Sequence, residues 1–67
     1  MANGTVKWFN ATKGYGFIAP DEGGKDVFVH ITAVRAAGLQ ALQDGQRVSY
    51  ELATERGKTS AANLKAL

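Results

Sequence analysis

The 67-residue sequence predicts an all-β fold, a closed antiparallel barrel of five strands. Short runs rich in β-branched and aromatic residues recur along the chain, and polar turns that contain glycine separate them. In so short a chain, a sheet that closes on itself buries one face of every strand and leaves no exposed edge. The same length limits the chain to one domain over residues 1–67.

The first half of the chain predicts three strands. Residues 5–10 form the first, because β-branched and aromatic side chains dominate until a polar turn that closes on glycine. Residues 15–19 form the second, which Pro20 ends, and two adjacent glycines then supply the positive φ that a hairpin turn needs. Residues 26–31 form the third strand.

A short helical turn and an irregular connection are expected next. Thr32 is a suitable N-cap for a helix through 33–37, which Gly38 would end. A longer helix over 32–43 is the alternative, since two leucines three residues apart would share one helix face. The irregular connection is preferred.

The second half predicts two further strands. Residues 46–53 alternate apolar and polar side chains, which is typical of a strand with one buried face. Residues 54–58 then turn the chain into a fifth strand over 59–65. The residues expected to face inward on these strands are Val48, Tyr50, Leu52, Ala62 and Leu64.

The two strands over 15–19 and 26–31 are expected to share an aromatic outer face. Alternation puts aliphatic side chains on the inner side of both strands. The side chains left facing solvent are Tyr15, Phe17, Phe28 and His30. A chain with little core material would normally bury such rings, because each removes a large apolar area from water. Their exposure therefore indicates a use.

The first strand requires an irregularity if its tryptophan is to join that face. Strict alternation puts Val6 and Trp8 on one side and Lys7 and Phe9 on the other. A bend or bulge near Lys7 would turn Trp8 outward and leave Phe9 partly buried.

Charge placement favours a polyanionic partner for this face. The net charge is +2, and residues 1–20 hold Lys7 and Lys13 but no acid. Exposed rings stack on unpaired nucleobases, and neighbouring lysines neutralise phosphates. A single-stranded nucleic acid is therefore the favoured partner, and a protein contact through the same rings is the alternative.

Other classes of protein are excluded or disfavoured by composition. With no cysteine and one histidine, the chain offers neither a disulfide framework nor a structural zinc site. The acids lie largely in turns and the histidine on an open face, so we expect no enzyme, no metal site and no cofactor. No apolar run is long enough to span a membrane and no signal peptide opens the chain, so a cytoplasmic location is expected.

Three segments resemble the cold-shock domain family: Lys-Trp-Phe-Asn at 7–10, Lys-Gly-Tyr-Gly-Phe-Ile at 13–18 and Asp-Val-Phe-Val-His-Ile at 26–31. The resemblance extends over essentially the whole chain, including Ser-Ala-Ala-Asn-Leu at 60–64, and looks like a bacterial member. The second segment also fits the opening of an RRM motif. Pro20 stands where that motif ends on an aromatic, and the chain lacks two full helices, so an RRM is excluded.

The resemblance implies an OB-fold-like barrel that binds single-stranded RNA and DNA. The residues it implies as contacts are Lys7, Trp8, Asn10, Lys13, Tyr15, Phe17, Asp26, Phe28, His30 and Arg56. Asp26 would accept hydrogen bonds from the edge of a base. Arg56 would reach a phosphate or stack its guanidinium group. Family members often carry phenylalanine where this chain has Ile31 and Leu39, so we expect a shorter footprint or weaker affinity, by about 1–3 kcal/mol per lost stack.

The resemblance also implies an RNA chaperone that needs no ATP. Such a protein, expected to be a monomer, would capture unpaired RNA or DNA of pyrimidine-rich or mixed sequence and shift folded RNA toward open conformers by mass action. Its action would bear on transcription and translation.

Overall fold

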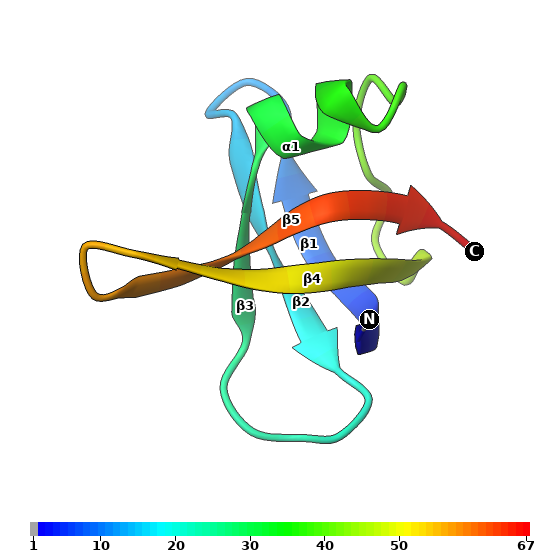
Figure 1. Ribbon diagram of the computed structural model, residues 1–67. Coiled ribbons are helices and arrows are strands. Elements are labelled where there is room, and N and C mark those ends of the chain that lie inside the picture. Colours follow the sequence, from blue (N-terminus) through cyan, green and yellow to red (C-terminus); the bar gives the residue numbers. More distant parts are fainter. Residues whose placement is uncertain (1) are drawn as a thin grey trace.

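Figure 1 shows the computed structural model, which describes residues 2–67: five strands curl into a barrel, and a short helix lies at one end. The elements are β1 (Ala2–Asn10), β2 (Tyr15–Pro20), β3 (Val27–His30), α1 (Ile31–Ala36), β4 (Arg47–Glu55) and β5 (Lys58–Ala66). The strands follow one another around the barrel in the order β1-β2-β3-β5-β4, and the ring is closed. The all-β, OB-fold-like barrel expected from the sequence is confirmed.

One seam of the barrel differs from the expected antiparallel pairing. β3 and β5 run parallel and are in register at Phe28 and Ser60. The other neighbouring pairs of the described strands are antiparallel. β3 and β5 can be parallel because a long crossover connection joins them, as parallel neighbours require. This crossover consists of α1, the connection after it and β4.

β1 begins three residues earlier than expected. Residues 2–5 pair with residues 47–50 of β4, and this non-local pairing holds the start of the chain in the sheet. On its other side this segment lies close to β2, and glycine at position 4 permits that approach, because a Cβ there would lie 2.7 Å from both the Ala19 carbonyl oxygen and Cγ2 of Ile18.

α1 starts at Ile31, and the expectation that Thr32 is its N-cap is wrong. His30, the last residue of β3, has extended backbone angles and is the N-cap. Its Nδ1 accepts a hydrogen bond from the backbone N–H of Thr32 at 3.2 Å. The strand therefore passes into the helix without an intervening loop.

α1 ends at Ala36, and the expected glycine stop is confirmed. Gly38 has a φ of +82° and donates its N–H to the Arg35 carbonyl at 2.9 Å. The N–H of Leu39 donates to the Val34 carbonyl at 3.1 Å, which completes a Schellman motif. The chain reverses here, so the longer helix is wrong.

The β4–β5 hairpin is longer than the sequence predicts. Its turn is only Arg56 and Gly57, with φ of +52° and +77°, instead of the expected turn over 54–58. Positive φ at both central residues is the pattern of a type I′ turn, whose twist matches that of the strands. Figure 1 shows this hairpin reaching out from the barrel, and Leu52 on it is 59% exposed rather than buried.

A β-bulge in β5 changes which of its residues face inward. β5 has one more residue than β4 opposite Tyr50, and Asn63 takes a φ of +48° there. The alternation of sides shifts by one residue as a result. Ala61 and Leu64 are therefore buried together, whereas the sequence predicted Ala62 with Leu64.

The core of the barrel is almost entirely aliphatic. Its buried side chains are Val6, Ile18, Val27, Val29, Val34, Leu42, Val48, Tyr50, Ala61 and Leu64. Burial raises the pKa of the Tyr50 hydroxyl, since the phenolate would lose its hydration. Among the described residues this tyrosine is the one aromatic ring that the barrel fully buries.

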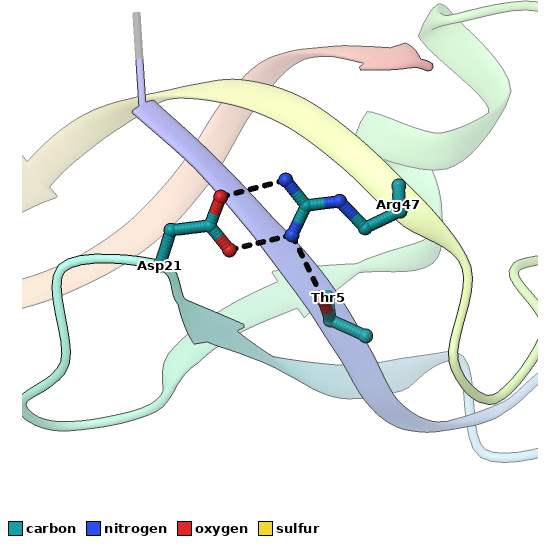
Figure 2. A network of polar contacts seen from close by, with 3 residues as sticks. All are labelled: Thr5, Asp21 and Arg47. Atoms are coloured by element: carbon teal, nitrogen blue, oxygen red, sulfur yellow. Dashed lines mark hydrogen bonds and ion pairs between the residues drawn. The ribbon is translucent and has the colours of Figure 1, made fainter.

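A bidentate ion pair joins three parts of the chain at the β1–β4 seam (Figure 2). The Nη1 and Nη2 atoms of Arg47 donate to Oδ1 and Oδ2 of Asp21 at 2.5 and 2.6 Å. Nη1 also donates to Oγ1 of Thr5 at 3.0 Å. The hydrogen bonds from Arg47 lower the pKa of the Asp21 carboxyl below its usual 3.8.

Asp21→Asn is expected to reduce the acid sensitivity of the fold. Because the pKa of Asp21 is lower in the folded state, the pair stabilises the fold above about pH 4, and that contribution is lost as the pH falls through the lowered value. Urea titrations at about pH 6 and pH 2 would measure it. The free energy of unfolding should fall by less in the variant than in the parent. Equal falls would show that the pair has no part in acid sensitivity.

Candidate nucleic-acid interface

Pairing of β2 with β3 places four rings on one face of the barrel. Tyr15 lies opposite His30, and Phe17 lies opposite Phe28. The intervening side chains, such as Val29, are fully buried. The outward direction predicted for these four rings is confirmed.

The predicted irregularity near Lys7 is present as a β-bulge in β1. The register shifts by one residue between Val6 and Trp8, so that Val6 lies opposite Ile18 and Trp8 lies opposite Phe17. Val6 is buried, whereas Trp8 is 39% exposed. Phe9 packs against the core, as expected.

Gly16 makes this arrangement of β1 possible. It lies opposite Phe9. A Cβ at this position would contact the backbone oxygen of Trp8 and would lie 2.7 Å from Cδ1 of Phe9. Any larger residue would displace Phe9 from the barrel or push Trp8 away from β2. The glycine next to Tyr15 is therefore required by packing.

The exposed rings form one connected cluster, which we call the aromatic face: Trp8, Tyr15, Phe17, Phe28 and His30. Its neighbouring ring centroids are 5.4 to 6.5 Å apart. Tyr15 and Phe28 lie nearly parallel at 26°, whereas Trp8 meets Tyr15 edge-on at 70°. Aromatic pairs of this kind stabilise one another. Three strands therefore hold the rings in place while part of each stays accessible.

Two of the predicted contact residues form an ion pair at one side of the aromatic face. Nζ of Lys7 lies 3.0 Å from Oδ2 of Asp26, and both side chains are well exposed. Exposed pairs of this kind contribute little to stability. Lys7 can therefore exchange its partner at small cost, and Asp26 keeps a free carboxylate oxygen as an acceptor.

Asn10 shapes the turn that carries Lys13. Its Oδ1 accepts from the backbone N–H of Lys13 at 3.0 Å, and its carbonyl accepts from the N–H of Gly14 at 2.8 Å. The Asn10 side chain thus has a structural role in addition to the contact predicted for it. Lys13 itself is exposed at the end of the aromatic face.

A groove of about 710 Å³ connects the aromatic face with the β4–β5 hairpin. Its lining residues are Phe17, Asp26, Phe28, Glu55, Arg56, Lys58, Thr59 and Ser60. Arg56, predicted as a contact, therefore lies beside the phenylalanines although it is far from them in sequence. The sequence reasoning missed Thr59 and Ser60 as lining residues, because it assigned them only to a strand and no local pattern reveals the parallel β3–β5 seam.

Ile31 and Leu39, the two aliphatic residues expected to shorten the footprint, are both half-buried against the core. Cγ2 of Ile31 would lie 3.3 Å from a Cβ at Gly14, so this side chain covers the turn next to Tyr15. These aliphatic side chains thus contribute packing at the α1 end of the aromatic face.

The geometry agrees with the comparisons with known proteins. A family model described as the 'Cold-shock' DNA-binding domain matches residues 2–67. The chain belongs to this cold-shock domain family. It is 68% identical to "Probable cold shock protein y4cH" of Sinorhizobium fredii strain NGR234, over 98% of this chain and 99% of that protein. It is 57% identical to "Cold shock protein CspA" of Rhizobium meliloti, over the same shares.

A relative of lower identity also matches over most of its length. The chain is 52% identical to "Cold shock-like protein CspE" of Escherichia coli K12, over 96% of this chain and 93% of that protein. This cold-shock domain is therefore a nucleic-acid-binding domain. Within residues 2–67, no helix is long and apolar enough to cross a membrane.

Arg56→Asn is expected to stabilise the cold-shock domain and weaken its binding of nucleic acid. Arginine is unfavourable at positive φ by roughly 1 kcal/mol, whereas asparagine suits the first position of a type I′ turn. Thermal unfolding and titration with a single strand would measure both effects. Arg56→Lys is the control, since it keeps the charge and the unfavourable φ. Unchanged affinity in Arg56→Asn would remove Arg56 from the interface.

Proposed function

We propose that this cold-shock domain binds single-stranded RNA and DNA by stacking nucleobases on the aromatic face. The observation that supports this most directly is that the five rings lie within 6.5 Å of their neighbours and remain accessible. A stacked base contributes about 1–3 kcal/mol with little dependence on its identity. Paired bases are already stacked on each other, so the face would select unpaired strands. The strands included in the proposal are of pyrimidine-rich or mixed sequence.

The contacts with phosphates would come from basic side chains around the aromatic face. Lys7 lies at the bulge in the middle of β1, Lys13 lies in the turn between β1 and β2, and Arg56 lines the groove. Lys58 lines the same groove. Asp26, in the groove between them, would accept from the exocyclic amine of a base.

The proposed activity is that of an RNA chaperone without ATP. Because the protein gains binding free energy only from unpaired strands, its occupancy shifts weak hairpins toward their open form. The proposal includes no catalysis and no cofactor. We place the protein in the cytoplasm as a monomer, where it would act on transcripts during transcription and translation.

Fluorescence of Trp8, the sole tryptophan, would test single-strand binding. A seven-nucleotide strand should quench it, and its matching duplex should not. With three or four basic residues involved, log affinity should fall with log salt at a slope of about −2 to −3. Phe28→Leu is a matched variant, since it keeps an apolar side chain but removes a ring. Quenching with little salt dependence, or none with any strand, would favour a protein partner for the aromatic face.

Opening of a marginally stable RNA hairpin would test the chaperone activity. The parent protein, without ATP, should increase the open fraction of a doubly labelled hairpin in proportion to occupancy. The double variant Phe17→Leu/Phe28→Leu should have no such effect at equal concentration, and its circular dichroism spectrum should match that of the parent. If the parent binds single strands at saturation but leaves the hairpin closed, the chaperone proposal fails and single-strand binding stands.

A further inference from the structure

His30 takes part in two features of the fold, the aromatic face and the start of α1. It is the last residue of β3 and a member of the aromatic face, with its ring centroid 6.3 Å from that of Phe28. It is also the N-cap of α1, through the hydrogen bond from the Thr32 N–H to Nδ1. Asparagine, aspartate, serine and threonine are the usual residues for this role, so an imidazole cap is uncommon.

The backbone geometry determines which nitrogen of a neutral His30 ring carries the proton. An amide N–H can only donate, so Nδ1 at 3.2 Å from the Thr32 nitrogen must carry a free lone pair. The Thr32 hydroxyl, 3.1 Å from the same Nδ1, can donate to it as well. In a neutral imidazole the single proton must then lie on Nε2. A ring protonated on Nδ1 would place two N–H groups against each other.

Among the described residues, the His30 imidazole is the side chain that caps the start of α1. The first turn of α1 contains no acidic residue. The N–H of Ile31, one residue earlier, donates to the Gly14 carbonyl at 2.8 Å, in the turn between β1 and β2. That bond and the imidazole cap together tie the start of α1 to the strands that carry Tyr15 and Phe28.

We propose that His30 is a positioning residue: the cap on α1 holds its ring in the aromatic face as the neutral tautomer with the proton on Nε2. The ring thereby presents a stacking surface and one N–H donor, which suits an acceptor oxygen of a bound strand, either a phosphate or a base carbonyl. The part that concerns the strand rests on the proposed function. The cap and the tautomer do not depend on it.

Long-range ¹H–¹⁵N correlation spectra of the free protein would identify the tautomer. At about pH 8, above the usual range in which imidazole titrates, the pattern should show a protonated Nε2 and an unprotonated Nδ1. Thr32→Val removes only the hydroxyl and should keep this pattern, because the backbone N–H remains. A protonated Nδ1, or a mixture of the two tautomers in the parent, would overturn the proposal.

Two variants separate the capping role of His30 from the stacking role of its ring. His30→Asn keeps a side chain that caps helices and should leave the urea midpoint of unfolding unchanged, while single-strand affinity falls roughly 5- to 150-fold with the lost stack. His30→Phe keeps a ring but cannot cap, so its urea midpoint should fall. Equal midpoints in the two variants would overturn the capping role.

Strand binding provides the last readout. In the parent, a bound strand should slow the exchange of the Nε2 proton with water, because the donor then has an acceptor. Continued fast exchange at saturation would overturn the donor role and leave the cap intact. If no strand binds at all, the proposed function fails. The tautomer and the urea midpoints of unfolding would still test whether His30 caps α1.

Discussion

The β-bulge between Val6 and Trp8 is the feature on which both faces of the barrel depend. With one extra residue in β1, Val6 and Phe9 turn inward while Trp8 turns outward beside Phe17. A regular strand with Val6 inside would put Trp8 in a core with no room for it and, at the same time, Phe9 on the surface. Gly16 is the other half of this arrangement, since only a residue without Cβ allows β2 to lie against the bulge. Core packing and the aromatic face thus share one local deviation.

The division between an aliphatic core and an aromatic surface follows from the size of the barrel. Branched aliphatic side chains fill a narrow barrel in few rotamers, and Tyr50 is its one fully buried ring among the described residues. Phe9 packs partly against the core, and the rings of the aromatic face lie outside, where several of them meet edge-to-face. They retain part of the stability that burial would give and keep surface for a ligand. The arrangement is a compromise between folding and binding.

Local patterns in the sequence were sufficient to predict the aromatic face where β2 and β3 form it. The alternation around Phe17 and Phe28 is regular, and the need for a bulge at Lys7 followed from the conflict between Trp8 and Phe9. The second half was harder because its irregularities depend on distant partners. Nothing near Asn63 signals the bulge that buries Ala61, and the length of the hairpin that exposes Leu52 is set by pairing between β4 and β5.

The helix start was missed for a related reason. Threonine is a strong N-cap by statistics, so Thr32 was the natural prediction. The structure uses His30, because β3 runs directly into α1 and its last side chain reaches the free N–H. The candidate site itself was predicted as a set of residues, but not the groove that brings Arg56 to Phe28, since that depends on the parallel seam.

The charge distribution around the aromatic face indicates which force would dominate binding. Lys7 is already paired with Asp26, so a phosphate that binds Lys7 replaces an existing partner and gains little net free energy. Lys13 and Arg56 lie at separate ends of the site, on a turn and on a hairpin. On the proposed function, stacking would therefore contribute more than phosphate neutralisation. Stacking is tolerant of sequence and requires unpaired bases. On the proposed function, such a site suits a protein that binds many different unpaired strands, because stacking depends little on their sequence.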